Sequence, residues 1–150
     1  MGWETHLLTG ALTGYMVTQQ PLGAVVGGIA GLVPDIDEPK SKLGRLVPMM
    51  AKQLKHTLGH RTFTHSLVFV LLVGVLIQWL TQNNMMTTAA VAGLCSHIIA
   101  DMLTGRVQIF YPLPVKLGIR MNKRQAKRMD TGAKYLISIA CFVMIYYAFR

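Results

Sequence analysis

The sequence predicts an all-α protein: a polytopic membrane helical bundle of about five membrane segments, forming a single integral membrane domain over residues 1–150. Three observations predict this class. Hydrophobic residues make up 52% of the chain and charged residues 14%, whereas about 25% of residues are charged in a typical soluble domain. Five apolar stretches follow one another along the chain. The Lys and Arg residues, which give a net charge of +9, gather in two blocks between those stretches.

The first two apolar stretches, residues 7–18 and 22–33, predict a helical hairpin that is broken at Pro21. Proline is well tolerated in the first turn of a helix, so Pro21 is expected to open the second arm. Each arm is shorter than the roughly 20 residues that a full crossing needs. The hairpin is therefore expected to tilt, to extend past these limits, or to enter the bilayer only partly.

Three further stretches, residues 66–81, 85–104 and 135–149, predict longer membrane helices. Trp79, near the end of the first of them, suits a membrane interface. Gly105 is expected to terminate the helix over 85–104, because glycine commonly follows the last helical residue. The basic segment 116–130 has two interpretations: an amphipathic piece that lies on the membrane surface, or a solvated loop.

The positive charges also predict an orientation. Loops 38–62 and 105–134 are rich in Lys and Arg, whereas the turns at 19–20 and 82–84 carry no charge. By the positive-inside rule, both basic loops and the N-terminus are cytoplasmic, and the C-terminus is outside after five crossings. This distribution favours a topology signal over a nucleic-acid footprint. The expected partners are membrane lipids with anionic headgroups, and no nucleic acid is expected.

A set of His and Asp residues maps to the cytoplasmic face of this topology. His97 and Asp101 stand four residues apart, so their side chains share one helix face, and ionisable residues inside an apolar span mark a functional site. Asp35 and Asp37 would point the same way from an extended segment. Thr64 is expected to cap the third helix and to place His65 in its first turn. The full set is His6, Asp35, Asp37, His60, His65, His97 and Asp101.

This residue set predicts a site for a divalent metal. Imidazole and carboxylate ligands suit zinc, with manganese or iron as further options, better than calcium. Seven candidates exceed the three protein ligands of a catalytic zinc, so two ions also fit. Asp37 is a candidate general base, and Arg61 is a candidate clamp for a phosphate oxygen.

Each of these residues also has a simpler interpretation: His6 as an amphipathic residue at the membrane interface, Asp35 and Asp37 as an ordinary turn after proline, and His60 or His65 as a helix cap or a contact to lipid headgroups. Arg61 could anchor a lipid headgroup. The pair His97 and Asp101 could form a hydrogen bond that only packs helices together. His56 lies among lysines and is interpreted as a surface residue outside the site.

Four sequence blocks stand in a characteristic order: residues 5–8 (THLL), 34–37 (PDID) with 39–41 (PKS), 59–61 (GHR) with 63–67 (FTHSL), and 96–104 (SHIIADMLT). In this order they resemble the YdjM-like family of bacterial inner-membrane proteins, which are described as predicted metal-dependent hydrolases. The resemblance covers about residues 4–114 and leaves the last apolar stretch unmatched. It implies that the seven His and Asp residues are the shared metal-type residues of that family.

The chain departs from the family pattern at two places. Glu38 stands where the family often has His, and residues 105–110 differ from the usual Gly-containing approach to the turn at Tyr111 and Pro112. The leading hypothesis is a metal-dependent hydrolase in the bacterial inner membrane, with a lipid or other amphiphilic phosphoester as substrate. One alternative is a non-enzymatic membrane protein with a structural or transported metal. Another is a membrane protein whose polar residues only pack its helices.

Overall fold

The computed structural model describes residues 1–148, and within them the chain is all α-helical, with no β-strand. This confirms the predicted fold class. Two short 3₁₀ turns lie between the helices: η1 (Val33–Asp37) and η2 (Phe63–His65). The six α-helices of the described residues are α1 (Trp3–Thr18), α2 (Pro21–Ala30), α3 (Pro48–Thr57), α4 (Leu67–Thr81), α5 (Asn84–Thr104) and α6 (Lys123–Ala148).

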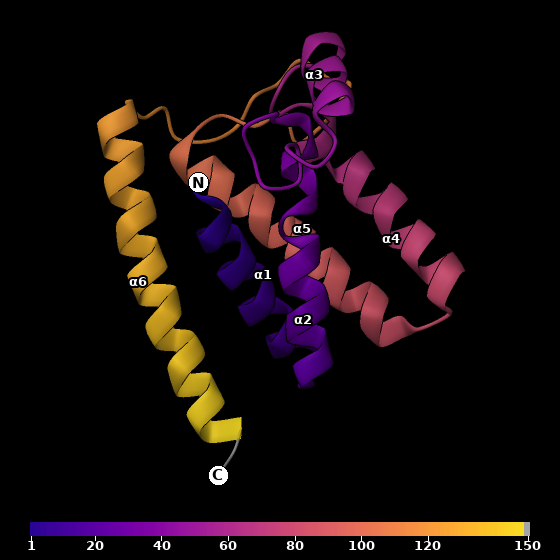
Figure 1. Cartoon of the computed structure of the whole chain (residues 1–150), viewed down its shortest axis with the longest axis vertical. Coiled ribbons are helices and arrows are strands. Elements are labelled where there is room, and N and C mark those ends of the chain that lie inside the picture. Colours follow the sequence, from indigo (N-terminus) through magenta and orange to yellow (C-terminus); the bar gives the residue numbers. More distant parts are fainter. Residues whose placement is uncertain (149–150) are drawn as a thin grey trace.

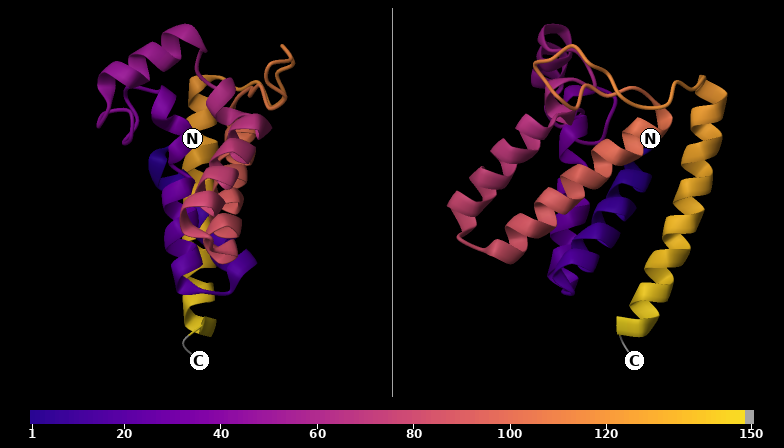
Figure 2. Two further views of the ribbon diagram at one scale, coloured as in Figure 1. Left: turned by 90° about the vertical axis from the view of Figure 1, so that its right-hand side faces the viewer. Right: turned by 180° about the vertical axis from the view of Figure 1, so that it is seen from behind.

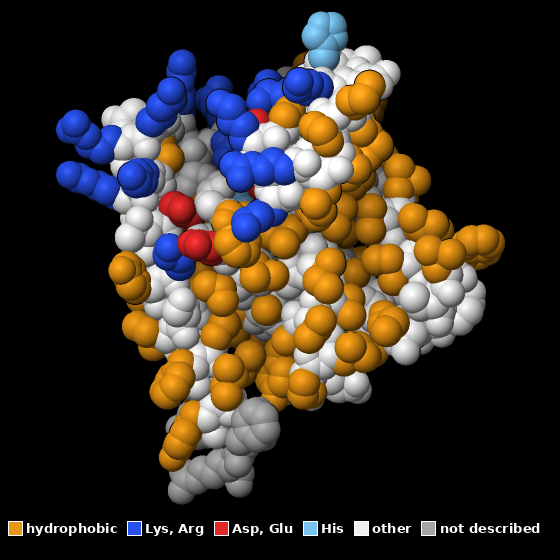
Figure 3. Space-filling model, viewed as in Figure 1, with side chains coloured by type: hydrophobic (Ala, Val, Ile, Leu, Met, Phe, Trp, Pro, Cys, Tyr) orange, Lys and Arg blue, Asp and Glu red, His pale blue; other side chains and the backbone are white. Residues whose placement is uncertain are grey.

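Five of these helices run between the two ends of the molecule, and the short helix α3 lies with the long loops at one end (Figures 1 and 2). Lys and Arg side chains gather at that end, whereas hydrophobic side chains cover most of the remaining surface on the face shown in Figure 3. The connections α1–α2 and α4–α5 lie at the opposite end (Figure 1). The fold therefore separates the basic loops from the neutral turns, and the end that carries α3 is called the basic end below.

Among the described residues, two helices are long and apolar enough to cross a membrane: α5, and residues Lys123–Tyr146 of α6. Helix α4 is apolar but has 15 residues, and α1 and α2 have 16 and 10. A full crossing needs roughly 20 residues. The five-crossing topology therefore stays a prediction, and the short first hairpin agrees with the sequence pattern.

Helices α1, α2 and α5 cross at glycine residues. A Cβ atom added at Gly27 would overlap the carbonyl oxygen of Gly10, and one at Gly93 would overlap the carbonyl oxygen of Gly27. Gly14 and Gly23 form a second such contact further along α1 and α2. Small residues at this spacing allow helix backbones to touch directly in membrane proteins. The crossing brings the start of α1, the end of α2 and the end of α5 to the same place.

The buried apolar core lies between α2, α4 and α5. Leu94 and Ile98 of α5 pack there with Val70 of α4 and Ala30 of α2, and Val107 closes the core from the loop after α5. The outer surface stays strongly apolar, with exposed large side chains such as those along α4 and the second half of α6. Exposed apolar surface of this extent is typical of contact with lipid or partners.

The last helix begins earlier than the sequence pattern indicated. The segment 116–130 is neither a separate surface piece nor wholly a loop, because α6 begins at Lys123 and continues without a break into the apolar stretch. Lys and Arg have good helix propensity, so this basic segment forms helix although it lacks an apolar repeat. Phe149, which the prediction placed in the last stretch, lies outside the described residues. The amphipathic helix α3, within loop 38–62, was not predicted.

Candidate metal centre

The fold brings the seven predicted His and Asp side chains together at the basic end. Each belongs to a segment that begins or finishes at this end: His6 in α1, Asp35 and Asp37 in η1, His60 and His65 between α3 and α4, and His97 and Asp101 in the last turns of α5. Five of them are buried, while Asp35 and His60 are half-buried. Their role as metal ligands stays a prediction, but their convergence is a property of the fold.

The two aspartates of PDID lie on a 3₁₀ turn, so the predicted extended segment was wrong. Pro34 sits in the first turn of η1 and favours this conformation. In a helix of three residues per turn, positions two apart point in different directions. As a result, Asp35 Oδ1 lies 3.8 Å from Nε2 of His65, whereas Asp37 Oδ2 lies 3.8 Å from Nδ1 on the other side of the same ring.

Four side chains form the first cluster: Asp35, His65, His97 and Asp101, with one ligand atom from each within 4.8 Å of all the others. The Nε2 atoms of His65 and His97 are 3.1 Å apart. Asp101 Oδ2 lies 3.4 Å from the first of these nitrogens, and Asp35 Oδ1 lies 3.7 Å from the second. Around a tetrahedral zinc with bonds of about 2.1 Å, ligand atoms stand about 3.4 Å apart. The cluster has the dimensions of a single-ion site.

The hydrogen bonds behind the two histidines fix their tautomers. Nδ1 of His97 lies 2.7 Å from the carbonyl oxygen of Gly31, which can only accept, so this nitrogen carries the proton. The Thr64 hydroxyl donates its one proton to Asp37 Oδ2 at 2.7 Å, and its oxygen therefore accepts from Nδ1 of His65 at 2.9 Å. In a neutral imidazole the other nitrogen then has a free lone pair. Two lone pairs that face each other at 3.1 Å repel unless a proton or a metal ion lies between them, so this pair of nitrogens could hold a metal ion.

His6 supports the same conclusion. Its ring stacks on that of His97, with centroids 3.7 Å apart, and its Nε2 lies 3.4 Å from Asp101 Oδ1. The side chain is fully buried, and neither of its nitrogens has a hydrogen-bond partner within residues 1–148. Buried polar atoms are nearly always paired. The free nitrogens, together with the nitrogen and oxygen donors around them, fit zinc, manganese or iron.

A second group is formed by Asp35, Asp37 and His60, whose ligand atoms also lie within 4.8 Å of one another. Asp37 Oδ1 lies 2.8 Å from Nδ1 of His60. Burial alone would lower the pKa of His60, but the hydrogen bond and negative charge of Asp37 raise that pKa above its usual value. Burial opposes ionisation of Asp37 as well, yet the hydrogen bonds from His60 and Thr64 lower its pKa. Burial raises the pKa of Asp35, which belongs to both groups.

Arg61 contacts both Asp101 of the cluster and Gly105 at the end of α5. Its Nε donates to Asp101 Oδ2 at 2.8 Å. Its guanidinium lies over Gly105, where an added Cβ would overlap Nη1. Gly105 ends α5 as predicted, and it also provides the space that Arg61 occupies. Although residues 105–110 depart from the family pattern, the first of them is a glycine whose missing side chain leaves room for Arg61.

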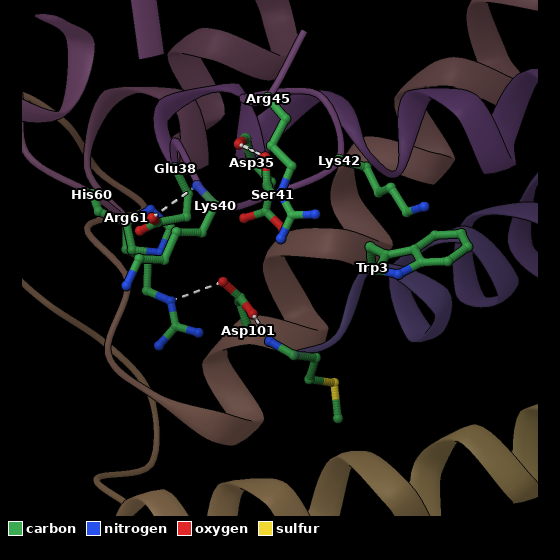
Figure 4. A pocket seen from close by; sticks show the side chains of 11 residues that line it. Trp3, Asp35, Glu38, Lys40, Ser41, Lys42, Arg45, His60, Arg61 and Asp101 are labelled. Atoms are coloured by element: carbon green, nitrogen blue, oxygen red, sulfur yellow. Dashed lines mark hydrogen bonds and ion pairs between the residues drawn. The ribbon is translucent and has the colours of Figure 1, made fainter. Parts of the chain in front are cut away.

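A cavity of about 290 Å³ opens over Asp35 and Asp101. Figure 4 shows Asp101 on one side of this space and Arg45 on the other, with Arg61 beside Asp101. Lys42 closes one edge, where its Nζ lies 4.5 Å from the centre of the Trp3 ring. The cavity thus combines carboxylates of the cluster with a wall of positive charge. The basic side chains that line it are Lys40, Lys42, Arg45 and Arg61.

Thr64 does not cap α4, so that expectation was wrong. Ser66 is the cap: it has extended backbone angles directly before Leu67, and its hydroxyl accepts from the backbone N–H of Phe69. The 3₁₀ turn η2 ends at His65 and leaves Thr64 free to face Asp37. Thr64 therefore contacts Asp37 and His65 of the site and does not cap α4.

Asp130 is a residue that sequence reasoning missed. Its Oδ1 accepts from the backbone N–H of Gly2 at 2.9 Å and from the hydroxyl of Thr5 at 2.7 Å. Helix α1 has no side-chain cap of its own. Asp130 therefore secures the first turn of α1, directly beside His6, from the distant helix α6. The one available signal was an isolated acidic residue within a strongly basic segment.

Two further residues, His56 and Glu38, are not among the seven predicted ligands. His56 is exposed on α3 and belongs to neither group. Glu38, which stands where a further ligand was in question, forms an ion pair with Lys55 and lines the cavity. Neither residue contributes to the clusters.

A helical bundle with membrane-length apolar helices and a buried His/Asp cluster at its basic end defines a membrane-type protein with a candidate metal centre. The chain belongs to the family of YdjM inner membrane proteins, whose family model matches residues 1–150. The match includes α6, so the family resemblance extends beyond the limits of 4–114 drawn from the sequence blocks.

Individual relatives agree with this assignment. The uncharacterized protein YvsG of Bacillus subtilis (strain 168) is 30% identical over 156 residues, which cover 98% of each chain. The inner membrane protein YdjM of Escherichia coli (strain K12) is 43% identical over 79 residues, or 49% of this chain and 40% of that protein. The protein of the same name from Shigella flexneri has the same identity and coverage. No solved structure matches the chain.

Proposed function

We propose that this protein is a membrane-bound, metal-dependent hydrolase with its site at the cytoplasmic membrane face, acting on a lipid or other amphiphilic phosphoester. The observation that carries the proposal is the buried cluster in which Nε2 of His65 and Nε2 of His97 face each other at 3.1 Å. Asp35 and Asp101 complete the ligand set for one divalent ion, with His6 as an adjacent fifth donor. Zinc is the metal that these donors suit best.

A divalent ion held by these ligands would lower the pKa of a water molecule and polarise the scissile phosphoester. His60 is the residue placed to accept the proton, because its side chain is partly exposed and lines the cavity. Asp37 holds Nδ1 of this ring, so Nε2 is the proton-accepting atom. Asp37, the candidate base from the sequence, thus acts through His60 in this proposal.

Arg61 supplies the contact to the substrate phosphate. Asp101 occupies its Nε, which leaves the two Nη groups for phosphate oxygens. Lys40 and Arg45 add positive charge to the same cavity. The basic end borders a strongly apolar outer surface, which supports a substrate bound at the level of anionic lipid headgroups.

The test is metal analysis followed by a hydrolysis assay on the protein purified in detergent without chelators. We expect at least one equivalent of bound metal and release of product from a panel of lipid phosphoesters. His97→Ala should lose both, while His56→Ala, a histidine outside the site, should keep both. Stoichiometric metal without turnover of any lipid would overturn the hydrolase and leave a non-enzymatic protein with a structural or transported metal. If the purified protein contains no metal, the remaining interpretation is a membrane protein whose polar residues only pack its helices.

A further inference from the structure

A second cavity, of about 370 Å³, adjoins the one over the metal cluster. The two cavities share Met1 and Arg61 in their walls. The second is lined further by Thr104 at the end of α5 and by Lys123 and Lys127 on the first turns of α6. The lysines stand four residues apart and therefore share one face of the helix. This cavity is not used by the reaction proposed above.

The second cavity carries a net positive charge. Among the described residues, Asp130 is the one carboxylate in its walls, against Arg61, Lys123 and Lys127, so the positive charges outnumber it. Within residues 1–148, neither Lys123 nor Lys127 forms an ion pair. Two ammonium groups and a guanidinium outnumber this single carboxylate and favour an anionic ligand.

Arg61 lies between the two cavities and can contact ligand groups in both. Its Nε is fixed by Asp101, and in the described part of the chain neither Nη has a hydrogen-bond acceptor. The guanidinium presents its donors as a planar fork that matches two phosphate oxygens. Since Gly105 leaves space for this group, the fork lies at the boundary of both cavities.

We propose that the second cavity binds a second phosphate group, so that the substrate is a membrane-anchored diphosphate ester. This inference rests on the proposed hydrolase function. The terminal phosphate lies at the metal cluster, and the lipid-linked phosphate lies between Lys123 and Lys127. The second position is assigned to the lipid-linked group because the apolar, lipid-exposed part of α6 follows directly after these turns, from Tyr135 onward.

The reaction balances as a simple hydrolysis. The oxygen of water forms a bond to the terminal phosphorus, and its proton goes to Nε2 of His60. The bond between that phosphorus and the bridging oxygen breaks. The bridging oxygen leaves with the lipid-linked phosphate, so the products are inorganic phosphate and a lipid monophosphate.

The test is a binding titration of the metal-loaded protein in lipid nanodiscs, with farnesyl diphosphate, farnesyl monophosphate and inorganic pyrophosphate as probes. Farnesyl diphosphate should bind at least about tenfold more tightly than the monophosphate, the effect of one or more charge-assisted hydrogen bonds. It should also bind more tightly than pyrophosphate. Equal affinity for the two farnesyl probes would overturn the second phosphate site, and pyrophosphate binding as tightly as farnesyl diphosphate would overturn the membrane anchor.

The double variant Lys123→Gln, Lys127→Gln should weaken the binding of both farnesyl probes, because both carry a lipid-linked phosphate, while metal content stays unchanged. The matched control is Arg124→Gln, Arg128→Gln, which removes the same charge from residues of α6 that do not line the cavity. Unchanged affinity for the farnesyl probes in the first variant, or an equal loss in both variants, would contradict the assignment. Tight diphosphate binding without release of phosphate would instead overturn the hydrolase and leave the second site in place.

Discussion

At the scale of single residues, the proton of one hydroxyl group orients the His/Asp cluster. Thr64 donates to Asp37 and accepts from His65, so it determines which nitrogen of that histidine faces the other ligands. The Gly31 carbonyl has the same effect on His97. Outer groups of this kind raise metal affinity because they fix the tautomer and orientation of the ligand ring.

Thr64→Val should therefore weaken metal binding although it removes no ligand. The expected loss of affinity is about 10–100-fold, the usual effect of deleting an outer-sphere partner. Thr64→Ser keeps the hydroxyl and should bind nearly as the original chain does. A competition titration with a chromogenic zinc chelator measures both variants. Equal affinity for Val and Ser at this position would show that the hydroxyl does not orient His65.

The residues of the cluster could be predicted from the sequence because ionisable side chains stand out in apolar surroundings. His97 and Asp101 are conspicuous inside α5, and PDID is conspicuous after a glycine-rich helix. Thr64 could not be assigned in the same way, because a threonine shortly before a helix is usually a cap. Its actual role depends on Asp37, 27 residues earlier in the chain, and this contact exists only after folding.

At the scale of helices, the glycine crossing determines how closely the ligand-bearing segments approach one another. Gly27→Ala would place a methyl group against the backbone of α1. We expect the free energy of unfolding to fall by at least about 1–3 kcal/mol, the usual cost of overpacking. The loss can be larger here because the neighbouring atoms belong to the backbone and cannot easily move aside. Gly132→Ala is the control, since a Cβ there meets nothing within 4 Å. Thermal unfolding in detergent should show a lower midpoint for Gly27→Ala alone, and similar midpoints would contradict direct backbone contact.

The link between α6 and α1 gives a second prediction at this scale. Asp130→Ala removes the acceptor for Gly2 and Thr5, and it should cost about 1–2 kcal/mol, as the loss of a helix cap does. Because His6 follows Thr5, metal affinity should fall as well. Asp130→Asn retains a side-chain oxygen and should restore most of both. Equal stability and equal metal affinity for Asp130→Asn and Asp130→Ala would show that the side-chain oxygen at this position does not stabilise the first turn of α1.

The helices themselves were predictable to the extent that they carry apolar runs. Helices α4 and α5 follow such runs closely, and Pro21 opens α2 as expected. Helix α3 and the basic turns of α6 lack this signal, so their helical state became visible only in the structure. The 3₁₀ turn at PDID was missed because a short segment after proline is compatible with either conformation.

At the scale of the whole molecule, all basic loops lie at one end, and this supports a defined orientation in the membrane. We expect a cysteine at Asn83 to react with a membrane-impermeant maleimide on intact cells, and a cysteine at Lys52 to react only after permeabilisation. Both variants are made in a chain with Cys95→Ala and Cys141→Ala. Labelling of the position at 52 in intact cells would contradict the cytoplasmic basic end. Neither residue takes part in the clusters, so metal content serves as a control for folding.

The number of membrane crossings could not be predicted from the sequence as reliably as the fold class. Hydropathy identifies apolar segments, but α1, α2 and α4 are shorter than a standard span, and their depth depends on tilt and on packing within the bundle. The separation of charge along the molecule was predictable, because it follows directly from the two basic blocks.

The candidate ligands come from segments that are far apart along the chain, and this has a consequence for biogenesis. His6 leaves the ribosome long before Asp101, and the donors from η1 and from the segment before α4 follow between them. A complete cluster can exist only after α5 has joined α1 and α2 at the glycine crossing. Loading of the metal would then be a late event in membrane insertion, and a chain that stops before α5 would carry exposed, unpaired donors open to quality-control proteases.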